Sequence, residues 1–385
     1  MRLIASAAIA LASSTRLGAQ LPVVQRPDST APVVAIHAPR TPLPPEAASV
    51  RETRFSFIAY GDTRGRRDGV AEQYEHGLVV ASMLQTIKAM ANGPDPVRFV
   101  LQSGDAVVNG GDPRQWNASF VSLINRVTTE GGVPYFLAPG NHDVTGSEDL
   151  ANPGRQTGLG NYLRAMQLLI PPDRSARRLS GYPTYSFGYG NTFVLAFDSN
   201  IADDSTQYAW IKGQLEGLDR RRYENIVAFF HHPAYSSGPH GGAVVERPTA
   251  QIRARYMPLF RNHGVKLLLT GHEHLYEHWV ERWRDSTGRV RRMDQIVSGG
   301  GGAPIYTYQG EPDLRQYRLD SGRDSVRVQH LARPSTEAGE NAHHYVVFHV
   351  DGPRIRLEVI GVDWGLAFQP YRSSRAVLSD SGATR

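Results

Sequence analysis

The stretch VKLLLTGHEHLYE at residues 265–277 joins an apolar run directly to a cluster of imidazole and carboxylate side chains. The run from Val265 to Thr270 is short and rich in branched apolar residues, which predicts a buried β-strand. The chain then changes to the polar sequence GHEH at residues 271–274. Glycine favours a tight turn at the end of a strand. We therefore expect His272 and His274 to lie in a loop just beyond the carboxyl end of a strand.

The same succession of apolar strand and polar loop occurs four more times upstream. The predicted strands are Phe55–Tyr60, Val97–Gln102, Pro134–Ala138 and Ile226–Phe230. The polar residues that follow them are, in order, Asp62, Asp105, Asn141 with His142, and His231 with His232. Each cluster alone would fit a turn or a helix cap. Sites in open α/β sheets form at the carboxyl ends of strands, so we expect the five clusters to converge.

The remaining patterns predict an α/β fold. Helical spacing of apolar residues occurs at 78–91, 116–127 and 252–260, between the predicted strands. A hairpin is expected at 185–197, turning at Gly190-Asn191. Further strands are expected at 295–298, 344–350 and 354–360, and the polar residues 310–342 are expected to form a long loop. Repeated strand–helix units with late hairpins indicate a mixed sheet.

The composition fits an ordinary globular protein, with 40% hydrophobic and 21% charged residues. The formal net charge is +5 and is carried mostly by arginine, without any long basic run. We therefore expect no specific nucleic-acid partner and a mild preference for anionic substrates. The absence of cysteine excludes disulfides and thiolate ligands, so a metal would be held by His, Asp, Asn or Glu.

The amino terminus has the pattern of a secretory signal at residues 1–19. Arg2 precedes the apolar run Leu3–Ala12, and small residues follow at Gly18-Ala19. The run is too short to span a bilayer, and no membrane span is expected. We expect a proline-rich linker at 20–53, a catalytic domain at 54–372 and a flexible tail at 373–385. The signal predicts a secreted or periplasmic protein.

The candidate site combines carboxylate oxygens, imidazole nitrogens and an amide oxygen. This mixture suits Zn²⁺, Mn²⁺ or iron rather than Ca²⁺. Two such ions about 3.5–4 Å apart can hold a phosphoryl group and generate a hydroxide between them. We therefore expect two divalent or Fe/Zn/Mn-type metal ions as cofactors.

These residues also carry a resemblance. The order of Asp62, the GD at 104–105, GNHD at 140–143, HHP at 231–233 and GHEH at 271–274 resembles that of the calcineurin-like metallophosphoesterases. The run GHEHLYE at 271–277 looks especially like the purple acid phosphatase branch, as do the tyrosine at 235 and the histidine at 240. The resemblance covers residues 55–306. It implies two mixed β-sheets packed as a sandwich and flanked by helices.

The resemblance also implies a role for each residue. Asp105 would bridge both metals; Asp62 and His274 would complete the first metal position. Asn141, His231 and His272 would complete the second metal position. His142 would contact the phosphate and protonate the leaving oxygen, and His240 would be a second substrate-facing histidine. His232 is expected to pack beside the ligands rather than to bind metal.

Two residues depart from the family pattern. Arg64 stands where most members have a histidine ligand, and Val108 stands where purple acid phosphatases have a tyrosine. The first metal position therefore lacks an expected ligand, because an arginine remains protonated and cannot bind a metal. Arg64 could clamp a phosphate oxygen, or it could form a salt bridge with a neighbouring acid. Without the tyrosine, no purple tyrosinate-to-iron colour is expected.

The expected reaction is the hydrolysis of a phosphorylated small molecule by a metal-bound hydroxide, with phosphomonoesters preferred. His142, His240 and Arg64 are the expected catalytic residues. Hydrolysis of phosphodiesters or nucleotides is the nearest alternative. A weakly active protein that only binds a phosphorylated ligand is another, as is an arginine-rich, surface-associating protein whose metal serves stability alone.

Overall fold

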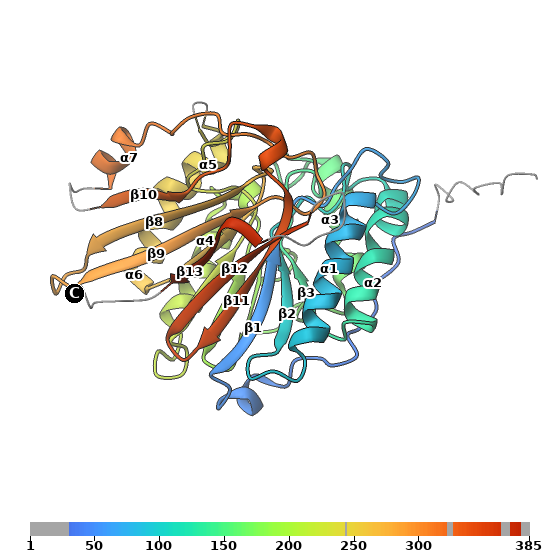
Figure 1. The fold of residues 1–385 in the computed structure, drawn as a ribbon, viewed down its shortest axis with the longest axis horizontal. Helices are drawn as coiled ribbons and strands as arrows, with labels where there is room; N and C mark the ends of the chain where they lie inside the picture. Colours follow the sequence, from blue (N-terminus) through green and yellow to red (C-terminus); the bar gives the residue numbers. More distant parts are fainter. Residues whose placement is uncertain (1–30, 243–244, 322–325, 363–369, 379–385) are drawn as a thin grey trace, which may run out of the picture.

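The computed structural model describes residues 31–242, 245–321, 326–362 and 370–378, which form two sheets packed face to face (Figure 1). Over these residues the first sheet has six strands, in the order β13-β12-β11-β1-β2-β3. Its strands are β1 (Arg54–Tyr60), β2 (Val97–Gln102), β3 (Tyr135–Leu137), β11 (His343–Asp351), β12 (Arg354–Val362) and β13 (Pro370–Leu378). β1, β2 and β3 are parallel, whereas β11 and β12 run antiparallel to their neighbours, so the sheet is mixed.

The second sheet is also mixed and has seven strands within the described residues, in the order β10-β8-β9-β7-β6-β5-β4. Its strands are β4 (Tyr185–Tyr189), β5 (Thr192–Ala196), β6 (Asn225–Phe229), β7 (Leu267–Thr270), β8 (Tyr276–Arg284), β9 (Val290–Ser298) and β10 (Arg327–Ala332). β5, β6, β7 and β9 are parallel, and β4, β8 and β10 are antiparallel additions. The predicted fold class, a two-sheet α/β sandwich, is confirmed.

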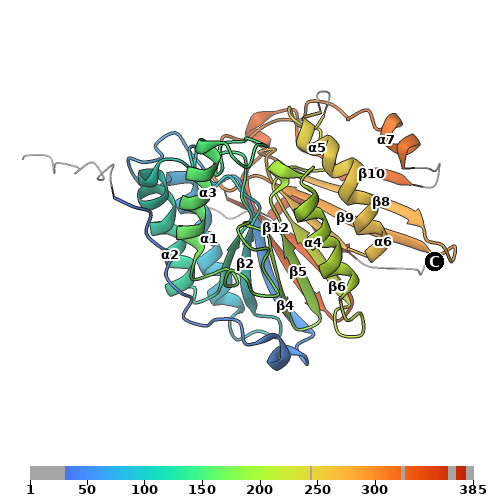
Figure 2. The same ribbon diagram turned by 180° about the vertical axis from the view of Figure 1, so that it is seen from behind.

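Helices cover the outer faces of both sheets. They are α1 (Tyr74–Met90), α2 (Ser122–Thr129), α3 (Pro153–Met166), α4 (Ser205–Glu216), α5 (Arg247–Gln251), α6 (Met257–His263) and α7 (Arg315–Asp320). Short helical turns occur at η1 (Glu46–Ser49), η2 (Gln115–Val121), η3 (Ser199–Ile201), η4 (Ile252–Tyr256) and η5 (Ala338–Glu340). In Figure 1 α1 and α2 stand beside the first sheet, and Figure 2 shows α4 and α6 over the second. No described helix is long and apolar enough to cross a membrane.

The apolar strands are buried on both faces. Val194 of β5 packs in the core shared with Phe57 of the first sheet, whereas the adjacent Leu195 packs with Phe260 of α6. A strand covered on both faces has no solvent side, so its sequence reads as a continuous apolar run. This is why the central strands were predictable from the sequence.

The segment expected to be a linker lies packed on the domain over its described part, residues 31–53. Ile36 is fully buried, and its backbone N–H donates to the carbonyl oxygen of Ala165. The carboxylate of Glu46 accepts hydrogen bonds from Arg177 and Tyr223. The prolines do prevent long regular elements, but they do not prevent packing, since the backbone bonds to the helices beside it. Residues 1–30, including the expected signal, lie outside the described residues.

The prediction of a long loop at 310–342 is wrong, because this segment contains α7, β10 and η5. β10 pairs with β8, and His330 stacks on Trp279 with the ring centroids 3.8 Å apart. The strand β10 was missed because its sequence alternates with polar residues, since an edge strand needs only one buried face.

The tail expected from residue 373 begins inside β13, which pairs with β12. α3 and α4 were not predicted, although Asn152 caps α3 and Pro153 begins it.

Candidate metal centre

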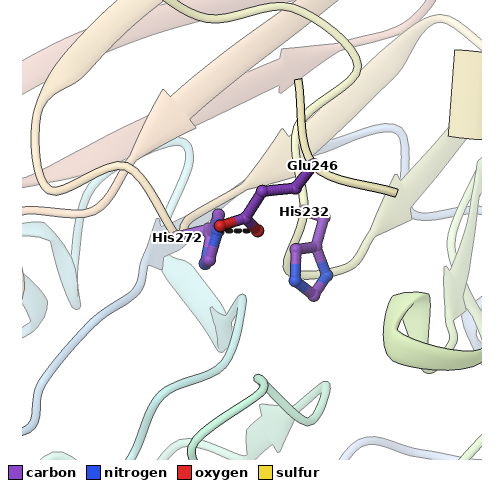
Figure 3. A group of neighbouring side chains, drawn as sticks. All are labelled: His232, Glu246 and His272. Atoms are coloured by element: carbon purple, nitrogen blue, oxygen red, sulfur yellow. Dashed lines mark hydrogen bonds and ion pairs between the residues drawn. The ribbon is translucent and has the colours of Figure 1, made fainter. Parts of the chain in front are cut away.

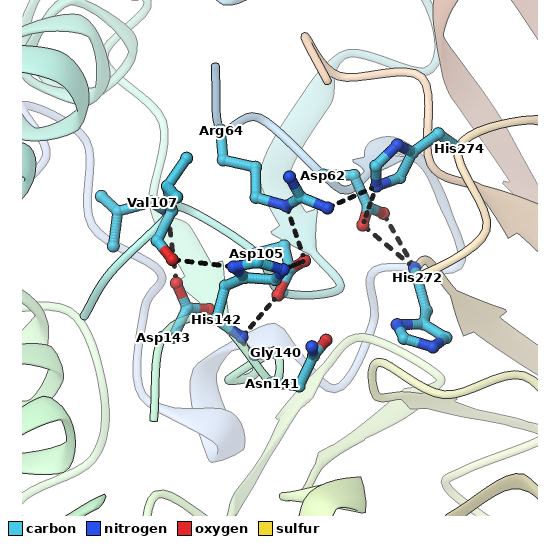
Figure 4. A network of polar contacts seen from close by, with 12 residues as sticks. Asp62, Arg64, Asp105, Val107, Gly140, Asn141, His142, Asp143, His272 and His274 are labelled. Atoms are coloured by element: carbon cyan, nitrogen blue, oxygen red, sulfur yellow. Dashed lines mark hydrogen bonds and ion pairs between the residues drawn. The ribbon is translucent and has the colours of Figure 1, made fainter. Parts of the chain in front are cut away.

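The polar loops that follow the parallel strands meet at one end of the sandwich. Asp62, Asp105 and the pair Asn141-His142 follow β1, β2 and β3 of the first sheet. His231 follows β6, and His272 and His274 follow β7, in the second sheet. Figure 4 shows side chains from both sheets facing one another at this point. The structure thus brings all six predicted metal ligands together.

Three of these residues have strained backbone. Asp62, Asp105 and His272 have φ angles of 60°, 55° and 69°, in the left-handed region. Such conformations cost about 1–3 kcal/mol each and persist only where the surroundings impose them. Gly140 allows the loops to approach, because a Cβ there would lie 2.2 Å from Oδ1 of Asp105. The backbone geometry therefore serves to aim these side chains at a common centre.

Lone pairs face one another at the second metal position. Nε2 of His231 lies 2.9 Å from Oδ1 of Asn141 and 3.1 Å from Nδ1 of His272. Nδ1 of His231 lies 2.9 Å from the carbonyl oxygen of Ser103, which can only accept, so Nδ1 carries the proton. Likewise Nε2 of His272 lies 2.9 Å from the carboxylate of Glu246, which can only accept, so the neutral ring of His272 carries its proton on Nε2. The three facing atoms are therefore all acceptors.

This set of acceptors fits a metal ion. Oδ1 of Asp105 lies 3.4 Å from Nε2 of His231 and adds a carboxylate to the set. Burial lowers the pKa of His231 to about 3, so its ring is neutral and available as a ligand. Two imidazoles, an amide oxygen and a carboxylate suit Zn²⁺, Mn²⁺ or iron.

The first metal position is different. Asp62, Asp105 and His274 are buried, with one ligand atom of each within 4.8 Å of the others. Arg64 lies among them: its Nε is 3.0 Å from Oδ2 of Asp105, and its Nη2 is 3.2 Å from Nε2 of His274. Of the two roles predicted for Arg64, the structure shows the salt bridge. The donor set thus fits a metal at the second position, whereas at the first an arginine already contacts two of the three ligands.

His142 lies at the mouth of the site, with 30% of its side chain exposed. Its backbone N–H donates to Oδ1 of Asp105 at 3.0 Å. Nδ1 lies 2.7 Å from the carbonyl oxygen of Val108 and therefore carries a proton. Nε2 lies 4.0 Å from Oδ2 of Asp105 and is left to exchange protons with a bound molecule. The side chain of Val108, where a tyrosine was expected, is exposed.

His240 lies beside the ligands and is tied to them by Glu246. Nδ1 of His240 is 3.0 Å from Oε1 of Glu246. Figure 3 shows the contact of the same carboxylate, through Oε2, with His272. The hydrogen bond that His240 donates to the carboxylate of Glu246 raises the pKa of His240, which favours its charged form. His232 is buried and lies close to His272, with its Nδ1 2.9 Å from Oγ of Ser199. It therefore packs beside the ligand as expected, although it could also offer a nitrogen to a metal together with Glu246 and His272.

Sequence reasoning missed three acidic residues that position the site. Glu246 stands in a polar loop and belongs to no motif. Asp143 is buried and accepts from the backbone N–H groups of Ala106 and Gly140 at 2.9 and 2.8 Å, which joins the loops after β2 and β3. Asp68 accepts from Gly65 and Val108, and burial raises its pKa to about 6. The only available signal was the place of Asp143 in GNHD.

The fold and the site define a metallophosphoesterase architecture. The sequence model of the calcineurin-like phosphoesterases matches residues 56–276, more than half of the chain. The chain belongs to the calcineurin-like phosphoesterase family, and its motifs resemble the purple acid phosphatase branch.

Individual relatives are distant. The uncharacterized protein YvnB of Bacillus subtilis is 24% identical over 289 residues, which span 71% of this chain and 19% of that protein. Purple acid phosphatase 18 of Arabidopsis thaliana is 33% identical over 95 residues, or 24% of this chain and 21% of that protein. The solved purple acid phosphatase PPD1 of yellow lupin (Lupinus luteus) superposes with a TM-score of 0.56 at 18% identity, covering 86% of this chain and 54% of that one. The chain thus matches about a fifth of the length of these two curated relatives, and the lupin structure shares its fold.

Proposed function

We propose that the chain hydrolyses phosphate monoesters in a metal-dependent reaction. The observation that carries the proposal is the cluster of three facing lone pairs on Asn141, His231 and His272, which a cation would satisfy. A metal ion held there would provide an activated water and neutralise charge on the phosphoryl oxygens. The family to which the chain belongs supports the same reaction class.

His142 is the proposed general acid. The carbonyl oxygen of Val108 anchors Nδ1 of its ring, so in the imidazolium form the second proton, on Nε2, faces the site and can pass to the leaving oxygen. A proton so delivered removes the need to expel a charged alkoxide.

Two basic side chains beside the site support a monoester substrate. A monoester dianion carries one more negative charge than a diester, and Arg64 and His240 both lie beside the ligands. A groove of about 1510 Å³ is lined by Gly65, Arg66 and Arg67, which follow Arg64 directly in the chain, although none of the six ligands lines it. Its place beside Arg64 favours the second candidate, the hydrolysis of phosphodiesters or nucleotides, because a substrate larger than a simple monoester could extend towards it. The contacts of Arg64 at the first metal position favour the third, a protein that only binds a phosphorylated ligand.

The test compares turnover of p-nitrophenyl phosphate and bis(p-nitrophenyl) phosphate by protein loaded with Mn²⁺, Zn²⁺ or iron. A clear excess of monoester turnover that is lost on chelation is expected. Preference for the diester would replace the proposal by its second candidate. Absence of turnover with every metal would favour the binding protein.

We also propose that the protein is exported, on the basis of the signal pattern at residues 1–19. Expression of the full chain in a bacterial host should yield mature protein outside the cytoplasm, beginning near residue 20. Retention of the complete chain in the cytoplasm would count against export.

A further inference from the structure

The imidazole of His274 has one lone pair, and Arg64 already uses it. Nδ1 of His274 lies 2.9 Å from the carbonyl oxygen of Pro304, so the ring proton is on Nδ1. Nε2 is left as the acceptor, and Nη2 of Arg64 lies 3.2 Å away from it. A lone pair that accepts an N–H cannot bind a metal at the same time. The ring can serve Arg64 or a metal ion, but not both.

The second metal position has no comparable donor. The neutral rings of His231 and His272 carry their protons on Nδ1 and Nε2, respectively, so Nε2 of His231 and Nδ1 of His272 are acceptors. Nε2 of His231 contacts both Nδ1 of His272 and Oδ1 of Asn141. Among the described residues, no cationic side chain donates to these three atoms, whereas Arg64 donates to the ligands of the first metal position. The second metal position therefore needs a cation, whereas the first already contains the cationic side chain of Arg64.

Arg64 is held in place rather than loosely oriented. Its backbone N–H donates to the carbonyl oxygen of Asp105, and its own carbonyl oxygen accepts from the side chain of Gln73 at 3.2 Å. Its side chain is 19% exposed and forms a second bond to Asp105 through Nε. Arginine keeps its charge under all ordinary conditions, so it offsets the buried carboxylates of Asp62 and Asp105 without a metal. A metal ion beside it would also meet a like charge.

We propose that the guanidinium of Arg64 takes the place of the first metal ion, so that the chain binds one divalent cation, at the second metal position. The inference refines the proposed function, on which it rests for the presence of a metal. The active centre would then pair one exchangeable metal with one permanent cation supplied by the chain.

Metal content measures this directly. Full-length wild-type protein is loaded with excess Zn²⁺ or Mn²⁺, freed of unbound ions and measured by elemental analysis for ions per chain. One ion per chain is expected. The Arg64→His variant, which restores a fourth ligand beside Asp62, Asp105 and His274, should bind two. Arg67→His is the matched control, because Arg67 is exposed and lies three residues after Arg64 in the sequence. This variant should bind one ion per chain.

Substitution of a ligand at the second metal position should change the metal content, whereas substitution at the first should not. His231→Ala should reduce the wild-type content from one ion to none, whereas His274→Ala should leave it at one. Electron paramagnetic resonance of Mn²⁺-loaded wild type needs no variant, and therefore tests the inference even if a variant fails to fold. The spectrum of an isolated Mn²⁺ ion is expected, and the signal of an exchange-coupled pair would overturn the inference.

The outcomes separate this inference from the proposed function. One ion per chain without phosphoesterase turnover would support the inference and refute the function. Two ions in the wild type, with turnover, would do the reverse. No bound ion in the wild type would overturn both.

Discussion

Oε2 of Glu246 lies 2.9 Å from Nε2 of His272, on the side of the ring that faces away from the other ligands. The same carboxylate holds Nδ1 of His240 through Oε1. Hydrogen bonds from both rings keep the pKa of Glu246 well below its usual range, so the carboxylate stays charged. Such a partner fixes the tautomer of a ligand histidine and raises its basicity.

We predict that Glu246→Gln weakens metal binding by about 10- to 100-fold, because the ring of His272 loses its charged acceptor. Competition with a fluorescent Zn²⁺ chelator measures the affinity. His240→Asn is the control, since it leaves the bond between Glu246 and His272 intact and should retain the wild-type affinity. Equal affinity in Glu246→Gln and the wild type would show that the carboxylate does not tune the ligand.

His142→Asn should lower kcat for p-nitrophenyl phosphate by about 10²- to 10⁴-fold, because the leaving oxygen loses its proton donor. Metal content should remain unchanged, since His142 is not among the lone-pair cluster. Steady-state kinetics with metal analysis on the same sample checks both. His37→Asn, at an exposed histidine, is the control and should keep full turnover. A more activated leaving group should suffer less from His142→Asn, and an equal loss for all leaving groups would contradict the acid role.

Removal of the metal should destabilise the fold. A ligand present at 100 times its Kd contributes about 2.7 kcal/mol, which corresponds to roughly 3 °C in Tm for a chain of this size. Calorimetry before and after dialysis against a chelator measures the difference, and added Zn²⁺ should restore Tm. Asn141→Ala should show a much smaller response to chelator, and a response equal to that of the wild type would place the ion elsewhere.

Glu46→Gln should destabilise the protein by about 1 kcal/mol at neutral pH. Burial alone would raise the pKa of Glu46, but bonds from Arg177 and Tyr223 outweigh it and lower the pKa. Solvent screening limits the contribution of this ion pair to the free energy of unfolding, because the carboxylate of Glu46 is partly exposed. Since the folded pKa is depressed, this stability is complete above the unfolded pKa of about 4.3 and is lost as the pH falls towards the folded value.

Denaturant unfolding of wild type and Glu46→Gln at several pH values tests this prediction. The difference in unfolding free energy should be constant above about pH 5.5 and shrink below about pH 4.3. Glu72→Gln, at an exposed glutamate, should match the wild type throughout. A difference that grows on acidification would reverse the sign of the proposed linkage.

The apolar strands and the polar turns after them were evident in the sequence. β1, β2, β6 and β7 were predictable because strands buried on both faces have largely apolar runs, and in β1, β2 and β7 a glycine follows the run. The convergence of the metal ligands was also predictable, since the carboxyl ends of parallel strands share one edge. These ligands are Asp62, Asp105, Asn141, His231, His272 and His274. α4 and β10 escaped because they bury few side chains, and α3 escaped because its buried face includes Arg155, Gly158 and Asn161.

The sequence by itself determined which residue types could reach the centre, and that Arg64 and Val108 replace two expected ligands. Only the tertiary structure decided what Arg64 contacts, because the direction of its side chain depends on Asp105 and His274, which lie 41 and 210 residues away along the chain. It also decided the roles of Glu246 and of the segment at 31–53. Hydrogen-bond partners far apart in sequence leave no local periodicity, so their pairing exists only once the two sheets have packed.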